Sequence, residues 1–286
     1  MPPWLDDFFW TYQNLIYGIG INGLLALSMY VVLALGQLSL GQAAFMGLGA
    51  YSGALMTTQL HWPFWLVLPA SCVIPVIFAL IIGVPTLRLA GVYLAIATIG
   101  LGEVLRAVYL NIDTLLGFDL FGGALGISGI PSRATAWQIY GFLIIAIVAL
   151  WLIARSRIGR AMEAMREDET AASVMGIPLL RYKMGALIAS AALAGLAGSL
   201  AAHTSSFIGP NEYGFTSAVT ILSFALLGGI YAPISPVVGS FILTLLPELF
   251  RSVGEVRGLL NGAIIVIAVL FLPGGILPLR IRRRSA

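Results

Sequence analysis

The chain consists of long, nearly unbroken runs of apolar residues, with polar residues gathered in short stretches between them. A run of about 18 or more apolar residues indicates a transmembrane helix, because about 20 residues at a rise of 1.5 Å per residue cross the hydrocarbon layer of a bilayer. The pattern predicts an all-α polytopic membrane protein with about eight or nine such helices. The predicted spans are residues 15–36, 42–60, 63–84, 90–110, 137–154, 184–204, 216–230, 237–250 and 259–273. The last three are short or interrupted by glycine, so tilted, re-entrant or merged helices are alternatives there.

The composition supports a membrane protein and excludes an ordinary soluble domain. Hydrophobic residues make up 59% of the chain and charged residues 9%, and the mean hydropathy is +0.99. Soluble domains carry about 25% charged residues, so this chain cannot cover a water-facing surface. The net charge of +3 does not indicate a nucleic-acid partner, because the arginines lie at the predicted membrane edges.

The sequence also predicts that the chain holds no metal or cofactor and is not an enzyme. A single cysteine, Cys72, excludes an internal disulfide, and the only histidines, His61 and His203, lack metal-ligand spacing. A glycine-rich phosphate loop followed by Lys and Ser or Thr does not occur, so ATP binding through that motif is excluded. Ser199 and His203 lie four residues apart, but a serine hydrolase needs an oriented histidine and an oxyanion site that the sequence does not supply.

The distribution of arginine and lysine predicts the orientation in the membrane. The N-terminal stretch carries Asp6 and Asp7 and no basic residue, and placing it outside puts most basic residues in the cytoplasm. Eleven basic residues then lie inside: Arg88, the six between Arg155 and Lys183, and Arg280, Arg282, Arg283 and Arg284. Three lie outside (Arg133, Arg251 and Arg257), and Arg106 falls within a span. The segment 155–183 and the C-terminus are therefore predicted to be cytoplasmic.

This topology predicts a single transmembrane domain over residues 1–286. Its parts are a first helix group at 15–154, a charged cytoplasmic loop at 155–183, a second helix group at 184–273 and a basic tail at 274–286. Two longer connections, 111–136 and 203–215, fall on the extracytoplasmic side. Because no soluble domain is predicted on either side, any energy source or soluble receptor must be a separate chain.

The charged loop contains six basic and four acidic side chains within 29 residues. Good helix formers run from Arg160 to Met175, with Gly159 before them and Gly176 and Pro178 after them, which predicts one short helix. One interpretation is a solvated connection whose arginines only set the topology. However, acids do not contribute to topology, and a short helix with methionines and both signs of charge suits docking into a groove on a soluble partner.

The loop resembles a known family. The run "GRAMEAMREDETAASVMGI" and the following Arg181-Tyr182-Lys183 resemble the cytoplasmic loop of permease subunits of branched-chain amino acid ABC importers. The runs "ALIASAALAGLAGSLAAH", "FIGPNEYGF" and "LLGGI" resemble the same family, and so does the glycine-rich block "GQLSLGQAAFMGLGAY" at 36–51. The resemblance covers roughly residues 25–275 and is most specific at 36–53 and 159–215.

The resemblance implies a multi-pass permease of the bacterial plasma (inner) membrane whose loop supplies a coupling helix for cytosolic ABC ATPase subunits. It also implies a second, homologous or identical permease subunit and an extracytoplasmic solute-binding protein that delivers the substrate. The ATPase-coupling role falls on Gly159, Arg160, Glu163, Arg166, Glu167, Asp168, Glu169 and Gly176. Two features depart from the family: Gln42 stands where members usually have histidine, and an additional N-terminal hydrophobic helix found in many members is not seen.

The glycine-rich block at 36–51 is the predicted substrate pathway. Non-helical backbone at membrane depth is tolerated only where it is buried or lines a cavity, and glycine-broken helices with small polar residues are typical of transport sites. The alternative is a short turn at the aqueous surface, with Gly49 and Gly53 as a helix-packing motif. The pathway residues are predicted to be Gln37, Ser39, Gly41, Gln42, Gly47 and Tyr51.

Two further groups of residues have mainly structural interpretations. Glu103 and Arg106 lie one turn apart within a predicted span, and we expect a local ion pair rather than a proton relay. Ala191, Gly195 and Ser199 recur every four residues and predict a close-packing helix face, with a second permease subunit as one candidate for the packing partner.

The sequence is therefore best interpreted as an ABC-importer permease for branched-chain or related amino acids. A stand-alone secondary transporter or channel for small solutes is the alternative, although carboxylates that could bind a coupling ion are scarce within the predicted spans. An intramembrane enzyme would require catalytic groups that converge, and the sequence offers none.

Overall fold

The computed structural model describes residues 3–89, 91–117, 122–131, 133–249, 262 and 275–276. Within them the chain is helical apart from a two-residue strand pair and short connections. The α-helices are α1 (Pro3–Leu33), α2 (Gln42–Thr58), α3 (Phe64–Thr86), α4 (Val92–Leu116), α5 (Ala136–Arg155), α6 (Arg157–Glu167), α7 (Glu169–Val174), α8 (Leu179–Ser205), α9 (Phe215–Gly228) and α10 (Ile234–Leu249). The 3₁₀ helices are η1 (Gly123–Leu125) and η2 (Pro210–Tyr213), and the strands are β1 (Ile127–Ser128) and β2 (Phe207–Ile208).

Eight of the nine predicted spans fall on helices, which confirms the all-α polytopic fold class. Helices α3, α4, α5, α8 and the part of α1 from Tyr12 onward contain stretches long and apolar enough to cross a membrane. Helices α9 and α10 are apolar but shorter, as the glycine-broken sequence predicts. The ninth predicted span, 259–273, lies outside the described residues apart from Gly262.

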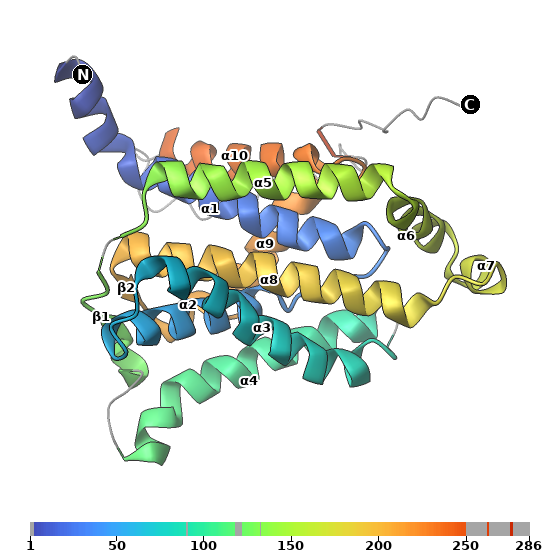
Figure 1. The fold of residues 1–286 in the computed structure, drawn as a ribbon, viewed down its shortest axis with the longest axis horizontal. Coiled ribbons are helices and arrows are strands. Elements are labelled where there is room, and N and C mark those ends of the chain that lie inside the picture. The colour runs from blue at the N-terminus through green and yellow to red at the C-terminus, as the bar shows by residue number, and fades with distance from the viewer. Residues whose placement is uncertain are drawn as a thin grey trace.

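Helix α8 occupies the centre of the bundle and packs against α1, α2 and α3. Helices α10 and α9 pack against α1 on the other side, and α5 also lies against α1 (Figure 1). The short helices α6 and α7 lie together at one end of the bundle, and the strand pair lies at the opposite end. The charged loop and the longer connections are therefore on opposite sides, as the predicted topology requires.

Small residues allow α8 to approach its neighbours at backbone distance. Ala191, Ala194 and Ala197 have no exposed surface, and a Cβ atom at Gly198 would collide with the carbonyl oxygen of Met46 on α2. A Cβ atom at Gly195 would lie 2.6 Å from Cγ of Pro75 on α3. The small residues that recur every four positions on α8 thus pack against α2 and α3 of the same chain. The neighbours of this face are therefore internal helices rather than a second permease subunit.

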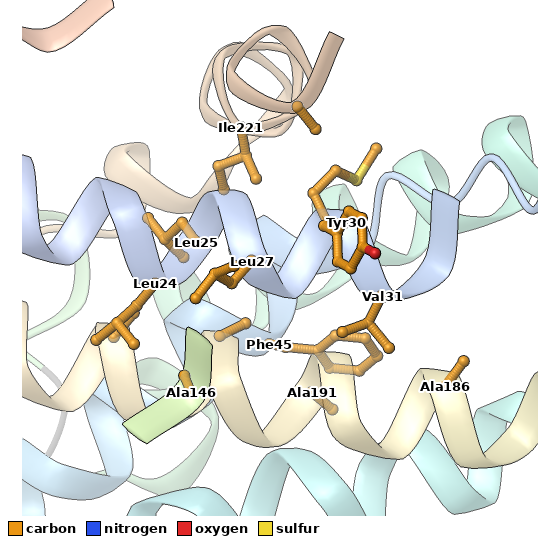
Figure 2. Close-up of a cluster of buried hydrophobic side chains, with 14 of the residues drawn as sticks. Leu24, Leu25, Leu27, Tyr30, Val31, Phe45, Ala146, Ala186, Ala191 and Ile221 are labelled. Carbon is orange, nitrogen blue, oxygen red and sulfur yellow. The ribbon is translucent and has the colours of Figure 1, made fainter. Parts of the chain in front are cut away.

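Apolar side chains from five helices meet around the inner face of α1 (Figure 2). Leu24 and Leu27 of α1 are fully buried, and they belong to one cluster with Phe45 of α2, Ala146 of α5 and Ile221 of α9. Lipid tails are as apolar as leucine, so close packing and interhelical hydrogen bonds, more than escape from water, hold such helices together. Within this region the Ser28 hydroxyl donates to the Ser190 carbonyl at 3.0 Å, which links α1 to α8.

The α2–α8 contact predicts a large effect of one added methyl group. Alanine at Gly49 would place its Cβ against the backbone carbonyl of Gly195, and neither backbone can yield without separating the helices. Overpacking of this kind costs about 1–3 kcal/mol, so Gly49→Ala should lower the thermal stability of the detergent-solubilised protein. The control is Gly100→Ala on α4, where the Cβ meets nothing within 4 Å. Equal melting temperatures of the two variants would contradict the packing argument.

Candidate functional site

The chain leaves the helical conformation directly after α1. Helix α1 ends at Leu33, and the turn that follows is closed by hydrogen bonds from Gly36 N to Leu33 O (2.9 Å) and from Gln37 N to Val32 O (3.3 Å). Gly36 has φ +77°, a left-handed conformation that glycine adopts without steric cost. The sequence then runs non-helically until α2 begins at Gln42.

This non-helical segment lies inside the bundle. Gln37, Ser39 and Leu40 are buried, and the Leu40 amide donates to the Thr98 hydroxyl of α4 at 2.9 Å. Gln42 Nε2 donates to the Ser190 hydroxyl at 3.3 Å. Because Ser190 lies near the middle of α8, α2 begins at mid-height of the bundle rather than at its end. The segment is therefore a break between α1 and α2 that enters the bundle, and Gly49 and Gly53 also pack closely against α8, as the alternative interpretation predicts.

The break carries polar groups that no described residue satisfies. Within the described residues, Gln37 Oε1 and Nε2 and Gln42 Oε1 are buried and have no hydrogen-bond partner. Leaving a buried polar group unpaired costs about 1–3 kcal/mol, so native proteins rarely keep one without a reason. Carboxamides are neutral donors and acceptors, and here they can bind water or the polar groups of a small solute.

The predicted pathway residues separate into two groups. Gln37, Ser39, Gly41 and Gln42 lie together at the break. Gly47 and Tyr51 lie further along α2 in an aromatic cluster with two other tyrosines. There Tyr51 stacks on Tyr109 with ring centroids 4.2 Å apart and meets the edge of Tyr213 at 5.9 Å. Gly47 leaves room for the Tyr213 ring, because a Cβ atom would lie 2.9 Å from its Cγ.

The aromatic cluster is covered by the two connections predicted to be extracytoplasmic. Strands β1 and β2 pair antiparallel, with Ile127 opposite Ile208, and so join the connections 111–136 and 203–215. Beside Tyr213, partial burial raises the pKa of Glu212 above its ordinary value. The two connections therefore form one continuous surface at this end of the bundle.

Glu103 and Arg106 form the predicted local ion pair, with Oε2 and Nη1 3.1 Å apart. The pair also ties α4 to the connection before α9, since Arg106 donates to Asn211 Oδ1 at 2.7 Å and Glu103 Oε1 accepts from Phe215 N at 2.9 Å. His203 likewise has a structural role. Its ring lies 2.8 Å from the Thr57 hydroxyl and 2.7 Å from the Ser199 carbonyl.

The charged loop folds as two helices, so the prediction of one helix from Arg160 to Met175 is wrong. Asp168 adopts an extended conformation (φ −155°, ψ 109°) that ends α6, and its Oδ1 accepts from Ala171 N at 3.0 Å to cap α7. Aspartate favours such a cap over a helix interior because its short side chain bonds to nearby backbone amides. Gly176 ends the segment with φ +81°, as predicted. Gly159 does not precede the helix but lies in its first turn, close to the backbone of Ala154.

One face of α6 and α7 is exposed and charged, and the other packs against the bundle. Arg160, Glu163, Glu167 and Asp168 are exposed. In contrast, Ala161, Met165 and Ala172 are buried, and Met162 is half-buried against the same core. The suggestion that the loop's methionines contact a partner is therefore wrong for Met162 and Met165.

Besides these apolar contacts, two charged residues connect this segment to the bundle. Lys183 of α8 is buried and forms an ion pair with Glu169 at the start of α7. Arg166 lies against the break after α1, because a Cβ atom on Gly36 would be 3.3 Å from its Cα. Its guanidinium also lies 5.1 Å from the Tyr231 ring centroid, and Nη1 lies 3.5 Å from the Ile230 carbonyl oxygen. Arg166 thus touches the chain after α1 and the chain after α9.

Sequence reasoning missed the residues that hold the break and the start of α7 in place. Thr98, Ser190 and Lys183 were not predicted, although each is a polar residue within or beside an apolar run. Such residues generally face the bundle interior, which would have indicated their burial but not their partners.

Comparison with known proteins agrees with the sequence resemblance. A profile of the family described as "Branched-chain amino acid transport system / permease component" matches residues 11–269. The high-affinity branched-chain amino acid transport system permease protein LivM of Salmonella typhimurium is 32% identical over 94% of this chain and 68% of the relative. LivM of Escherichia coli is 31% identical over the same shares.

A second permease protein of such systems is also similar. LivH of Escherichia coli is 32% identical over 51% of this chain and 47% of its own length. No solved structure matches the chain significantly. The profile match and the LivM relatives together show that the chain belongs to the family of permease components of branched-chain amino acid transport systems.

Proposed function

We propose that this chain is the membrane-spanning permease subunit of an ATP-driven importer for branched-chain or related amino acids in a bacterial inner membrane. The observation that carries the proposal is the contact between Arg166 of the charged loop and Gly36, the residue directly before the buried Gln37 of the break. It joins a charged surface suited to a soluble partner directly to unpaired polar groups inside the bundle. The charged loop 155–183 and the C-terminus face the cytoplasm in this proposal.

Cytosolic ATPase subunits dock on the exposed face of α6 and α7. Arg160 and Glu167 are exposed on α6 and provide both signs of charge. Charges at the rim of an interface mainly set orientation and partner choice, which suits a contact that must transmit motion in one direction. An extracytoplasmic solute-binding protein docks on the joined connections at the opposite end, and a second permease subunit completes the pathway.

The solute passes the break between α1 and α2. The amides of Gln37 and Gln42 can exchange water for the ammonium and carboxylate groups of an amino acid, and the surrounding side chains are mainly apolar. Because the break offers few hydrogen-bonding groups, the binding protein rather than the permease provides most of the selectivity for the solute.

Docking is tested by reversing exposed charges. We expect the double variant Arg160→Glu, Glu167→Lys to lose co-purifying ATPase subunits and ATP-dependent uptake at least tenfold, since like charges facing one another cost several kcal/mol. Arg166 and Asp168 are unsuitable positions, because Arg166 lies against the break and Asp168 caps α7. The control is Arg88→Glu, an exposed position after α3. Retention of the ATPase by the double variant would refute the docking face, and uptake by the permease alone in liposomes would instead favour a stand-alone transporter.

The link between α7 and α8 is tested at Glu169. Glu169→Ala leaves the buried ammonium of Lys183 without its partner, at a cost of about 1–3 kcal/mol. We expect amide hydrogen exchange in 169–174 to accelerate about tenfold, with the ATPase still bound and uptake reduced. Glu167→Ala, at an exposed position two residues away, should leave this exchange unchanged. Unchanged exchange in Glu169→Ala would show that the ion pair does not hold α7.

The pathway role of the break is tested with Gln37→Leu. Replacing a buried amide without partners by an apolar side chain of similar size should leave thermal stability unchanged or raise it, because no hydrogen bond is lost. If Gln37 contacts solute or pathway water, uptake should nevertheless fall about tenfold or more. Undiminished uptake in a stable Gln37→Leu transporter would remove Gln37 from the pathway.

A further inference from the structure

A cavity of about 830 Å³ lies between α5 and α8 at the end of the bundle that carries α6. Helices α5 and α8 lie on either side of α1 there, and α6 lies at this end of the bundle (Figure 1). The inner wall is apolar and includes Val31 of α1, Leu150 and Ile153 of α5, and Ala189 of α8. The proposed importer assigns no role to this space.

The outer end of the cavity is polar and carries an excess of positive charge. Arg166 of α6 and Arg181 of α8 line it, and Glu163 offsets one of their charges. Arg181 is exposed, and its guanidinium forms no hydrogen bond or ion pair in the part of the chain that the structure describes. Tyr182 and Tyr231 line the same end. Tyrosines and arginines at one level are typical of the membrane–water interface.

The helices that flank the cavity present apolar surface outward. On α5, Ile145 is 64% exposed and Leu152 58% exposed. On α8, Leu180 is 54% exposed directly beside Arg181, and Gly185 is an exposed residue of the cavity lining. Hydrocarbon-facing side chains therefore continue up to the positive end of the cavity.

We propose that this cavity binds one anionic phospholipid of the cytoplasmic leaflet. Its phosphate lies at Arg181 and Arg166, and an acyl chain lies along the apolar wall of α1, α5 and α8. Basic pockets between transmembrane helices on the cytoplasmic side are suited to anionic headgroups. The volume also exceeds what a single amino acid needs. The proposal goes beyond the importer function and rests on it for the orientation in the membrane and for the uptake that the test measures.

Occupancy has a mechanical consequence for the charged loop. Arg166 belongs to α6 and Arg181 to α8, and the two helices are joined only through α7 and residues 175–178 along the chain. A phosphate between the two guanidinium groups would hold α6 at a fixed position against α8. The lipid is thus expected to support the coupling of ATP hydrolysis to uptake.

The test uses the complete transporter with its ATPase and permease partners. Retention of phosphatidylglycerol is measured by native mass spectrometry, and ATP-dependent uptake is measured in phosphatidylcholine vesicles with and without phosphatidylglycerol. Arg181→Gln removes one charge, and Gly185→Leu fills the cavity from a position where a Cβ meets nothing within 4 Å. The matched controls are Arg88→Gln at an exposed site and Gly141→Leu, which is equally open and outside the cavity.

We expect Arg181→Gln to lower phosphatidylglycerol retention about fivefold, the equivalent of about 1 kcal/mol for one basic residue at an anionic surface. Gly185→Leu should abolish retention and the stimulation of uptake by phosphatidylglycerol, with melting temperature and uptake in pure phosphatidylcholine preserved. Both controls should behave as the unmodified transporter.

Three outcomes would overturn the proposal. Equal retention by Arg181→Gln and Arg88→Gln would show that the cavity does not select the lipid. Stimulation by inorganic phosphate in pure phosphatidylcholine vesicles would show that the site binds a free anion. Equal loss of uptake by Gly185→Leu in both kinds of vesicle, with lipid retention unchanged, would assign the cavity to the solute path. None of these results bears on ATPase docking, which the charge reversal on α6 tests separately.

Discussion

Burial of the non-helical backbone after α1 is the constraint on which the rest of the structure depends. Inside a membrane protein, peptide groups that leave the helix must find partners within the protein. The Leu40 peptide amide finds one in the Thr98 hydroxyl of α4, and the side-chain amide of Gln42 donates to the Ser190 hydroxyl of α8. Ser190 comes within reach of Gln42 because α2 lies against α8 at backbone distance, which requires glycine at Gly49 and Gly198. The packing of α2 on α8 therefore depends on both the glycine block and the small-residue face of α8. It also positions the polar groups of the break.

The same packing places the break next to the charged loop. Helix α1 ends at the level of α6, so Gly36 contacts Arg166 directly. Helix α2 begins deeper in the bundle, beside the middle of α8. A displacement of α6 can therefore reach the carboxamides of Gln37 and Gln42 across only a few residues of non-helical chain. If α1 continued without a break, the same displacement would have to move the whole rigid helix. The turn at position 36 requires a positive φ, and α6 requires space there for Arg166. Glycine meets both requirements.

Sequence patterns predicted the elements of this fold better than their contacts. Apolar runs located eight helices, because length and hydropathy decide membrane insertion residue by residue. Helix propensity failed at Asp168, where a side-chain cap outweighed the good helix formers on both sides. Periodicity identified the small-residue face of α8 but not its neighbour, since the same face suits an internal helix or a second subunit. The glycine block likewise gave no sign that Gln37 and Tyr51 lie in separate clusters.

The division of the charged loop into two helices gives it two different attachments to the bundle. Helix α7 is tied to α8 through Glu169 and Lys183, so it must follow that central helix. Helix α6 instead contacts the chain after α1 and after α9 through Arg166, and part of its inner side faces a cavity rather than packed side chains. Since the extended residue Asp168 separates the two, α6 can shift relative to α7 without breaking a helical hydrogen bond. A single continuous helix would move α8 and both non-helical segments together. In the proposed importer, the two-helix loop would instead allow a docked ATPase to move the break while α8 stays in place.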